Sequence, residues 1–255
     1  MRQYNYLQAF YRSFYCRALY RDVVNNWGAG VVLYLLMVLA ICWAVGMIEI
    51  QKTVDRGYEK LAQEYVPQMP HLLIENGVAT TPENHPYLIR NPENDKVTII
   101  VDTSGQYLNI DQAKSEVLVT KHEVMIKDSE NQVRIEKFPK SLNLDLVPAH
   151  AKDVLEGYVE YSWLFLFPLL LFLSFVYRLV QAVLYAVLGK IVSSLSGVNL
   201  NYLSNLKLSM VAITPAIVVA TILSLFNVII PLQLLLYFAL AVGYLIFAVL
   251  ANKNK

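Results

Sequence analysis

The sequence predicts an α-helical membrane protein with four transmembrane helices and a β-rich extracytoplasmic domain inserted between the first and second helices. Apolar residues make up 56% of the 255 residues and charged residues 16%, against about 45–50% and 25% in soluble domains. The charges are also unevenly distributed. Residues 51–160 hold 12 Lys/Arg and 18 Asp/Glu, and the rest of the chain holds 9 and 2. Such a division is typical of membrane segments flanking a soluble insert.

Residues 1–28 are predicted to form an amphipathic helix at the membrane interface. Apolar residues recur there at spacings of three and four, with Arg12 and Arg17 at the margins. The apolar set is Leu7, Phe10, Tyr11, Phe14 and Ala18. The alternative is an amphipathic helix docked on the protein's own transmembrane bundle.

The first span is predicted at 29–49, because the twenty residues from Ala29 to Ile48 carry no charge. A helix of that length covers about 30 Å, the thickness of a bilayer core. Ala44-Val45-Gly46 resembles a signal-peptide cleavage site. However, the 28 residues before the run are too long and too structured for a signal peptide, so we expect an uncleaved anchor.

Three more spans follow the charged block. Residues 161–188 form one uncharged stretch apart from Arg178, and Ser209–Ala251 is long enough for two spans joined near Asn227 and Pro231. The predicted segments are a span at 161–188, a loop at 189–207, spans at 208–227 and 231–251, and a tail at 252–255.

Basic residues in the short connections predict the orientation. Those flanking the spans all fall on one side of a four-helix arrangement, which is therefore expected to be cytoplasmic. They are Arg2, Arg12, Arg17, Arg21, Lys190, Lys207, Lys253 and Lys255. Both termini are then cytoplasmic, and the acidic block 50–160 lies outside.

The block 50–160 is predicted to be an α+β domain. A helix continuing from the first span should stop at Pro67 and Pro70, and a helix at 149–160 should lead back to the membrane. A β-hairpin is expected at 124–138 around the turn Asp128–Asn131. The predicted strands are Leu72–Ile74, Tyr87–Ile89, Val97–Val101, Val117–Thr120, Val124–Ile126 and Val133–Ile135.

No catalytic, cofactor-binding or metal-binding residues are predicted. Cys16 and Cys42 both lie outside the charged block, which excludes a disulfide framework there. Asp102-Thr103-Ser104-Gly105 resembles the Asp-x-x-Gly segment of GTPases, but the chain has no phosphate-binding G-x-x-x-x-G-K-[ST] loop, so a turn is expected. The four histidines are not spaced as local ligand pairs, and no G-x-S-x-G occurs.

Arg178 is the one formal charge within the three later spans. It lies 17 residues, about 25 Å, beyond Tyr161, which predicts a position near the cytoplasmic boundary. There its side chain can snorkel to lipid phosphates. An ion-relay role is the alternative, but no Asp or Glu is expected in the membrane to pair with it. Candidate functional or lipid-headgroup contacts are Arg178, Lys190, Lys207, Arg12 and Arg17.

The segments Val97–Gly105, Val117–Lys121 and Val124–Asp128, with Asn201-Tyr202-Leu203 through Ile213-Thr214-Pro215, carry a family resemblance. The chain resembles the bacterial membrane protein family catalogued as domain of unknown function 1189, which is distantly Yip1-like. This resemblance implies the same four-helix topology and a place in the bacterial inner membrane. It implies no activity.

The leading functional hypothesis is a non-enzymatic membrane accessory or scaffold protein whose outer domain binds a partner protein or senses the state of the envelope. The alternative is a lipid-handling or transport protein using the second and third spans around Arg178. An envelope enzyme with a distributed site is a third hypothesis. Expected partners are membrane lipids and a membrane protein or a second copy. Nucleic acid is excluded, because the chain has no basic block.

Overall fold

The computed structural model describes residues 2–128 and 132–253 and divides into two compact units. The helical unit comprises Met1–Gln51 and Trp163–Lys255, and the insert comprises Lys52–Ser162. Each unit has its own hydrophobic core.

The N-terminal region forms two helices, α1 (Tyr6–Arg12) and α2 (Arg17–Asn26), rather than the single helix predicted. Asn5 and Gln8 form a capping box at the start of α1. After α1 the chain turns, and the carbonyl of Ser13 accepts a hydrogen bond from the Tyr20 hydroxyl of α2 at 2.5 Å. The break therefore lets α2 fold back beside the end of α1.

The two helices of this region differ in burial. Leu19, Tyr20 and Val23 of α2 are fully buried, and α2 packs against α7 and α9. By contrast, Leu7 and Tyr11 of α1 are exposed. The docked alternative thus describes α2, and α1 keeps an exposed apolar face.

Four helical stretches are long and apolar enough to cross a membrane, and a β-sheet region lies between the first and second, as predicted. The helices are α3 (Gly30–Lys60), α6 (Ser162–Leu195), the pair α7 (Tyr202–Ala212) and α8 (Thr214–Leu225), and α9 (Gln233–Ala251). The third stretch begins at Tyr202 rather than at 208, because Asn201 caps it by accepting a hydrogen bond from the Ser204 N–H at 2.7 Å.

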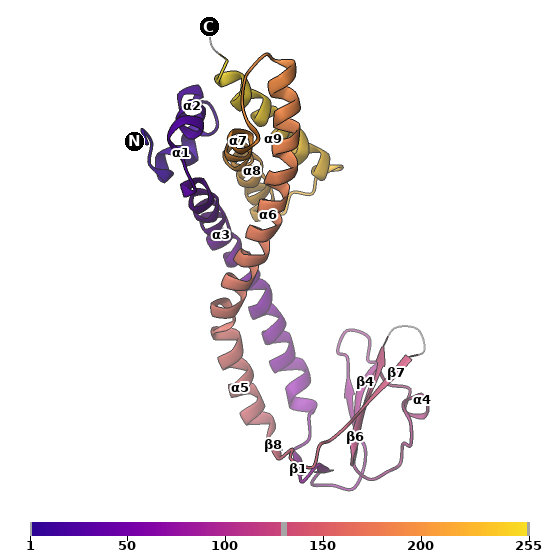
Figure 1. Ribbon diagram of the computed structural model, residues 1–255. Coiled ribbons are helices and arrows are strands. Elements are labelled where there is room, and N and C mark those ends of the chain that lie inside the picture. Colours follow the sequence, from indigo (N-terminus) through magenta and orange to yellow (C-terminus); the bar gives the residue numbers. More distant parts are fainter. Residues whose placement is uncertain (1, 129–131, 254–255) are drawn as a thin grey trace. The chain divides into compact units, whose positions relative to one another are not determined.

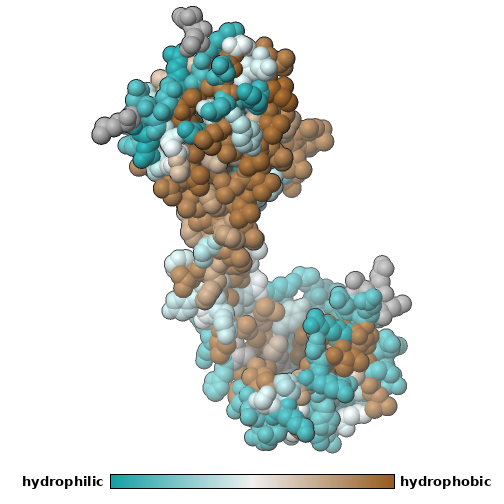
Figure 2. Space-filling view, viewed as in Figure 1, coloured by the Kyte–Doolittle hydropathy of each residue, from teal (hydrophilic) through white to brown (hydrophobic). Residues whose placement is uncertain are grey.

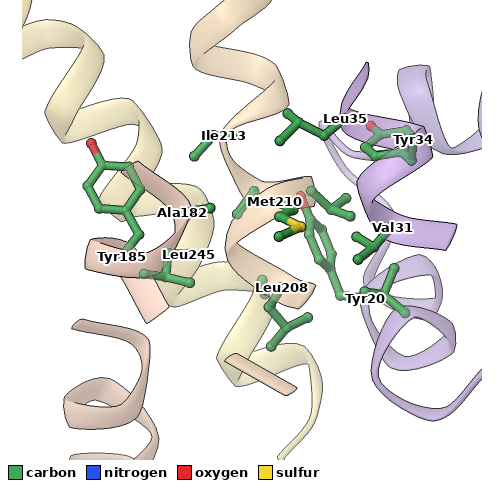
Figure 3. Packing of buried hydrophobic residues seen from close by; sticks show 14 of the residues in the cluster. Tyr20, Val31, Tyr34, Leu35, Ala182, Tyr185, Leu208, Met210, Ile213 and Leu245 are labelled. Atoms are coloured by element: carbon green, nitrogen blue, oxygen red, sulfur yellow. The ribbon is translucent and has the colours of Figure 1, made fainter. Parts of the chain in front are cut away.

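The core of the helical unit lies between α2, α3, α7 and α9. Figure 3 shows Tyr20 and Val31 facing Leu208 and Met210, with Leu245 on the other side of α7. Trp27 and Tyr34 are fully buried and pack edge to face at 5.6 Å. Outside this core the unit presents a broad apolar surface, and its end near the two termini is hydrophilic (Figure 2).

The insert begins with the end of α3, which continues into a π-helix (Leu61–Tyr65) and a 3-10 helix (Val66–Gln68), and it ends with α5 (Pro148–Glu160). Between them, one sheet has the order β2-β1-β8 and the other β3-β4-β5-β6-β7; the neighbouring strands β6 and β7 of the second sheet are labelled in Figure 1. The strands are β1 (Leu72–Glu75), β2 (Val78–Thr80), β3 (Tyr87–Arg90), β4 (Val97–Asp102), β5 (Val117–Thr120), β6 (Glu123–Asp128), β7 (Gln132–Lys137) and β8 (Leu144–Leu146).

All six predicted strands are present, and the sequence missed β2, β8 and the short helix α4 (Ile110–Ala113). The predicted hairpin is present as the antiparallel pair β6–β7, but most of its predicted turn, Asp128–Asn131, lies outside the described residues. Helix α4 connects the parallel pair β4–β5 and packs against β5 and β6. The resulting core is small: Ile100, Ile110, Ala113, Leu118 and Met125.

The two outer edges of the five-stranded sheet differ. At β3, the side chain of Gln68 accepts a hydrogen bond from the Arg90 N–H at 2.8 Å and donates one to the Arg90 carbonyl at 3.1 Å. This amide group takes the place of a neighbouring strand. At β7, all six residues are exposed.

Candidate functional site

A cavity of about 220 Å³ lies between α3, α6 and α8 of the helical unit. Its wall combines apolar side chains with one cation, one carboxylate, hydroxyls and a thiol. The polar members are Arg178, Glu49, Ser174, Thr221, Ser224 and Cys42. Polar groups inside an apolar helical bundle are costly, so a collection of them marks a candidate functional site.

Arg178 is the cation of this cavity. Its Nη1 donates a hydrogen bond to Gln181 Oε1 at 2.6 Å, and Gln181 Nε2 donates one to the Tyr185 hydroxyl at 3.2 Å. The guanidinium also lies 5.3 Å from the ring centre of Tyr177. Among the described residues, the buried Nε of Arg178 has no hydrogen-bond partner. The cation therefore keeps a buried donor available for a ligand or for water.

The structure gives the position of Arg178 along α6. Arg178 lines the cavity together with Cys42 and Glu49 of α3 and Thr221 of α8. In addition, α6 runs on to Leu195, so about 25 Å of helix separates Arg178 from that end. Arg178 thus lies about midway along α6, and its place near the cytoplasmic boundary of the membrane stays a prediction.

Glu49 lines the same cavity as Arg178. The expectation that no Asp or Glu in the membrane pairs with Arg178 stays a prediction, but the structure adds a carboxylate to the wall of the same cavity. The sequence places Glu49 at the last position of the first predicted span, but the helix continues without interruption to Lys60. This continuation keeps Glu49 within the helix and turns it toward the cavity.

The other four predicted contact residues do not line this cavity. Lys190 donates a hydrogen bond to the Leu200 carbonyl at 2.9 Å and so fixes the loop between α6 and α7. Arg12 lies 4.6 Å from the ring centre of Tyr4, and Arg17 lies 5.6 Å from that of Phe247. Lys207 is half-buried in α7.

Comparison with known families identifies the chain. Residues 7–249 match the family described as "Protein of unknown function (DUF1189)". The chain belongs to this family. No curated protein and no solved structure matches it. The family match thus confirms the predicted membership of this family but assigns no reaction, ligand or partner to this DUF1189 member.

Two further polar sites of this DUF1189 member escaped the sequence analysis. Asp22 is 3% exposed, and its carboxylate accepts hydrogen bonds from Trp27 Nε1 at 2.8 Å, Asn26 Nδ2 at 2.6 Å and the Gln3 N–H at 3.1 Å. It thereby holds the N-terminal segment against α2. In the sequence, this site could have been recognised from a single Asp in a nearly uncharged region.

The second is Asn205, which is fully buried where α6 meets α7. Its Oδ1 accepts a hydrogen bond from Ser193 Oγ at 3.0 Å, and its Nδ2 donates one to the Asn201 carbonyl at 3.0 Å. Gly189 of α6 allows the close approach, since a Cβ there would lie 2.9 Å from Asn205 Oδ1.

In the insert, Asp102 organises the turn predicted at 102–105. Its carboxylate accepts hydrogen bonds from the Ser104 N–H and Oγ at 2.9 and 2.6 Å, the Gly105 N–H at 3.0 Å and the Tyr107 N–H at 2.6 Å. Burial acts to raise the pKa of Asp102, but these hydrogen bonds outweigh it and lower the pKa. The Asp102 carboxylate thus stabilises the turn by accepting hydrogen bonds from the residues that follow it.

The histidines of the insert form local pairs. His71 contacts Asp145 at 2.6 Å, and His85 contacts Glu83 at 2.5 Å. Within residues 2–128 and 132–253, no group of three His, Cys, Asp or Glu side chains is arranged to hold a metal ion.

Proposed function

We propose that this protein spans the bacterial cytoplasmic membrane four times, with both termini in the cytoplasm and the insert outside. We further propose that it is not an enzyme and binds the phosphate of a phospholipid headgroup in the cavity around Arg178. The orientation rests on the basic residues flanking the apolar helices. The ligand rests on one observation: the buried Nε donor of Arg178 has no hydrogen-bond partner in the part of the chain that the structure describes.

The chemistry of the cavity favours a phosphate group. Arg offers several N–H donors in a rigid plane that matches phosphate oxygens, and Gln181 accepts a hydrogen bond from Nη1. The hydroxyls of Ser174, Thr221 and Ser224 supply further donors in the wall. These groups are set in a helical unit with a broad apolar surface, where lipid is the abundant source of phosphate.

The size of the cavity limits the ligand. Sites for whole small-molecule ligands commonly measure about 300–1,000 Å³, and this one measures about 220 Å³. The space therefore suits a headgroup whose acyl chains remain in the bilayer. Glu49 in the wall adds a carboxylate, which favours a headgroup carrying an ammonium over one with a net negative charge.

Thermal unfolding of the purified full-length chain in detergent tests this proposal. Added phosphatidylethanolamine should raise the unfolding midpoint of the wild type, because a ligand at 100 times its Kd stabilises by about 2.7 kcal/mol. Phosphatidylglycerol should act more weakly, and inorganic phosphate alone should have little effect. Arg178→Ala should remove the lipid-dependent rise.

Arg17→Ala is the matched control, since it removes one cation outside the cavity and should keep the lipid-dependent rise. Arg178→Lys keeps the charge but not the planar donor array, so it should retain part of the rise. An equal lipid-dependent rise in Arg178→Ala and the wild type would contradict headgroup binding at this cavity.

The accessory role is a second candidate, favoured by the exposed edge strand β7 in the insert. Such an edge offers unpaired backbone groups to another chain. Affinity capture after mild detergent extraction should recover a stoichiometric partner or a homo-oligomer. Recovery of the single chain alone would count against this role.

A further inference from the structure

Alternate residues of β7 direct their backbone N–H and C=O groups toward β6 and away from it. The Phe138 N–H donates to the His122 carbonyl at 2.9 Å, so β7 residues of even number bond to β6. The register pairs Ile126 with Arg134 and Val124 with Glu136 in the same phase. The backbone N–H and C=O groups of Val133, Ile135 and Lys137 consequently point away from the sheet.

The side chains of β7 are divided between the two faces of the sheet. Ile135 pairs with Met125 and continues the row Ile100, Leu118, Met125 of the core, yet it is 52% exposed. Arg134 and Glu136 lie on the opposite face, and Arg134 Nε contacts Glu136 Oε1 at 2.8 Å. An apolar row of the core therefore ends at an open edge.

We propose that β7 pairs antiparallel with β7 of a second copy of this chain, about a two-fold axis through Ile135. Ile135 then faces Ile135 of the other copy, and the two five-stranded sheets join into one of ten strands. Arg134 of each copy faces Glu136 of the other. The inference deepens the accessory role by naming its partner, and it is independent of the Arg178 cavity.

The strand is complementary to itself in one register. The outward-pointing groups belong to odd-numbered residues, so these must face odd-numbered residues of the other copy. An axis through Arg134 or Glu136 meets this condition but places that charged residue opposite the same residue of the other copy, which is unfavourable. An axis through Lys137 would place Ile135 opposite Pro139, which has no N–H to donate. An axis through Val133 would place Arg134 opposite Gln132 and lose both ion pairs. The axis through Ile135 keeps the apolar contact and both opposite-charge pairs.

The other edge of the sheet provides the comparison. Gln68 occupies the outward backbone groups of Arg90 at β3, so β3 is a poorer site for strand addition. Leu88 of β3 lies on the same face as Ile135, is 40% exposed and is a matched control position.

Disulfide trapping in membranes containing the full-length chain tests the pairing. Directly opposed residues in a hydrogen-bonded antiparallel pair have Cα atoms about 5.5 Å apart, within the range for a disulfide. Ile135→Cys should give roughly fivefold or more disulfide-linked dimer than Leu88→Cys. The unsubstituted chain, with Cys16 and Cys42 only, gives the background.

The register has its own test. Val133 of one copy faces Lys137 of the other in this pairing. Val133→Cys and Lys137→Cys should therefore cross-link when the two variants are co-expressed, and neither should cross-link alone. Cross-linking of each variant alone would overturn the register.

Charge reversal tests the ion pairs. In the Ile135→Cys background, Arg134→Glu should lower the dimer yield roughly fivefold or more, because two like-charge pairs replace two opposite-charge pairs. Adding Glu136→Arg should restore it. Protection of 97–128 from hydrogen exchange, unchanged among these variants, would show that the insert remains folded.

Equal dimer yields from Ile135→Cys and Leu88→Cys would overturn the self-pairing. So would an unchanged yield after Arg134→Glu. If either result came with capture of a different stoichiometric partner, the accessory role would stand and the second copy as its partner would not.

Discussion

The helical unit and the insert each contain a buried carboxylate that gathers hydrogen bonds from its own chain. Asp22 does this in the helical unit and Asp102 in the insert. The surroundings differ greatly. Asp22 lies beside an extensive core formed by α2, α3, α7 and α9, and Asp102 lies beside a core of only five buried residues. The insert should therefore depend on its carboxylate more than the helical unit does.

The largest effect is expected from Asp102→Ala. The substitution leaves the donors of Ser104, Gly105 and Tyr107 without their acceptor, which should destabilise the insert by about 3–5 kcal/mol. Hydrogen exchange of residues 97–120 in the full-length chain measures this loss. Asp111→Ala, at an exposed carboxylate of α4, should change stability by about 0.5 kcal/mol or less. Equal effects of the two substitutions would contradict the role of Asp102.

A smaller loss, about 2–4 kcal/mol, is expected from Asp22→Ala. Trp27 Nε1 and Asn26 Nδ2 lose their acceptor, but the surrounding core remains. The unfolding midpoint of the purified chain should fall, and Asn25→Ala, at an exposed position of α2, should leave it nearly unchanged. A loss greater than that of Asp102→Ala would reverse the comparison between the two units.

Gly189→Ala should cost about 1–3 kcal/mol, because the new Cβ would lie 2.9 Å from Asn205 Oδ1. Asn205 cannot move easily while it bonds to Ser193 and Asn201. Gly243→Ala in α9 is the matched control: none of the described residues lies within 4 Å of its Cβ position, so it should be neutral or stabilise by about 0.5–1 kcal/mol. Similar midpoints for the two variants would contradict the tight α6–α7 contact.

The smallest effect at neutral pH concerns the charge of Asp102. Its pKa is lowered in the folded insert, so its ionised form contributes stability above the ordinary Asp pKa of about 3.9. That contribution should be lost as the pH falls from there through the lowered pKa. Asp102→Asn should lack this loss, and an identical acid profile in both proteins would show that another group is responsible.

Parts of the candidate site could be predicted from the sequence. Arg178 stands out as a charge in an apolar segment, and it lines the cavity. The place of Glu49 in the wall of the same cavity could not be predicted, because it depends on how α3 and α6 pack against α8. Asp22 and Asn205 were missed because an isolated polar residue gives no local sign that distant donors will surround it.

By itself the sequence determined the four apolar helices, the strands β1, β3, β4, β5, β6 and β7 of the insert, and the turn at Asp102. Each follows from the composition and spacing of residues close together in the chain, and the bilayer thickness sets the required helix length. Only the tertiary structure decided that α2 docks while α1 stays exposed, that Glu49 shares a cavity with Arg178, and that Gln68 covers β3 while β7 remains open. These outcomes depend on contacts between segments that are far apart in the chain, and local patterns do not encode such contacts.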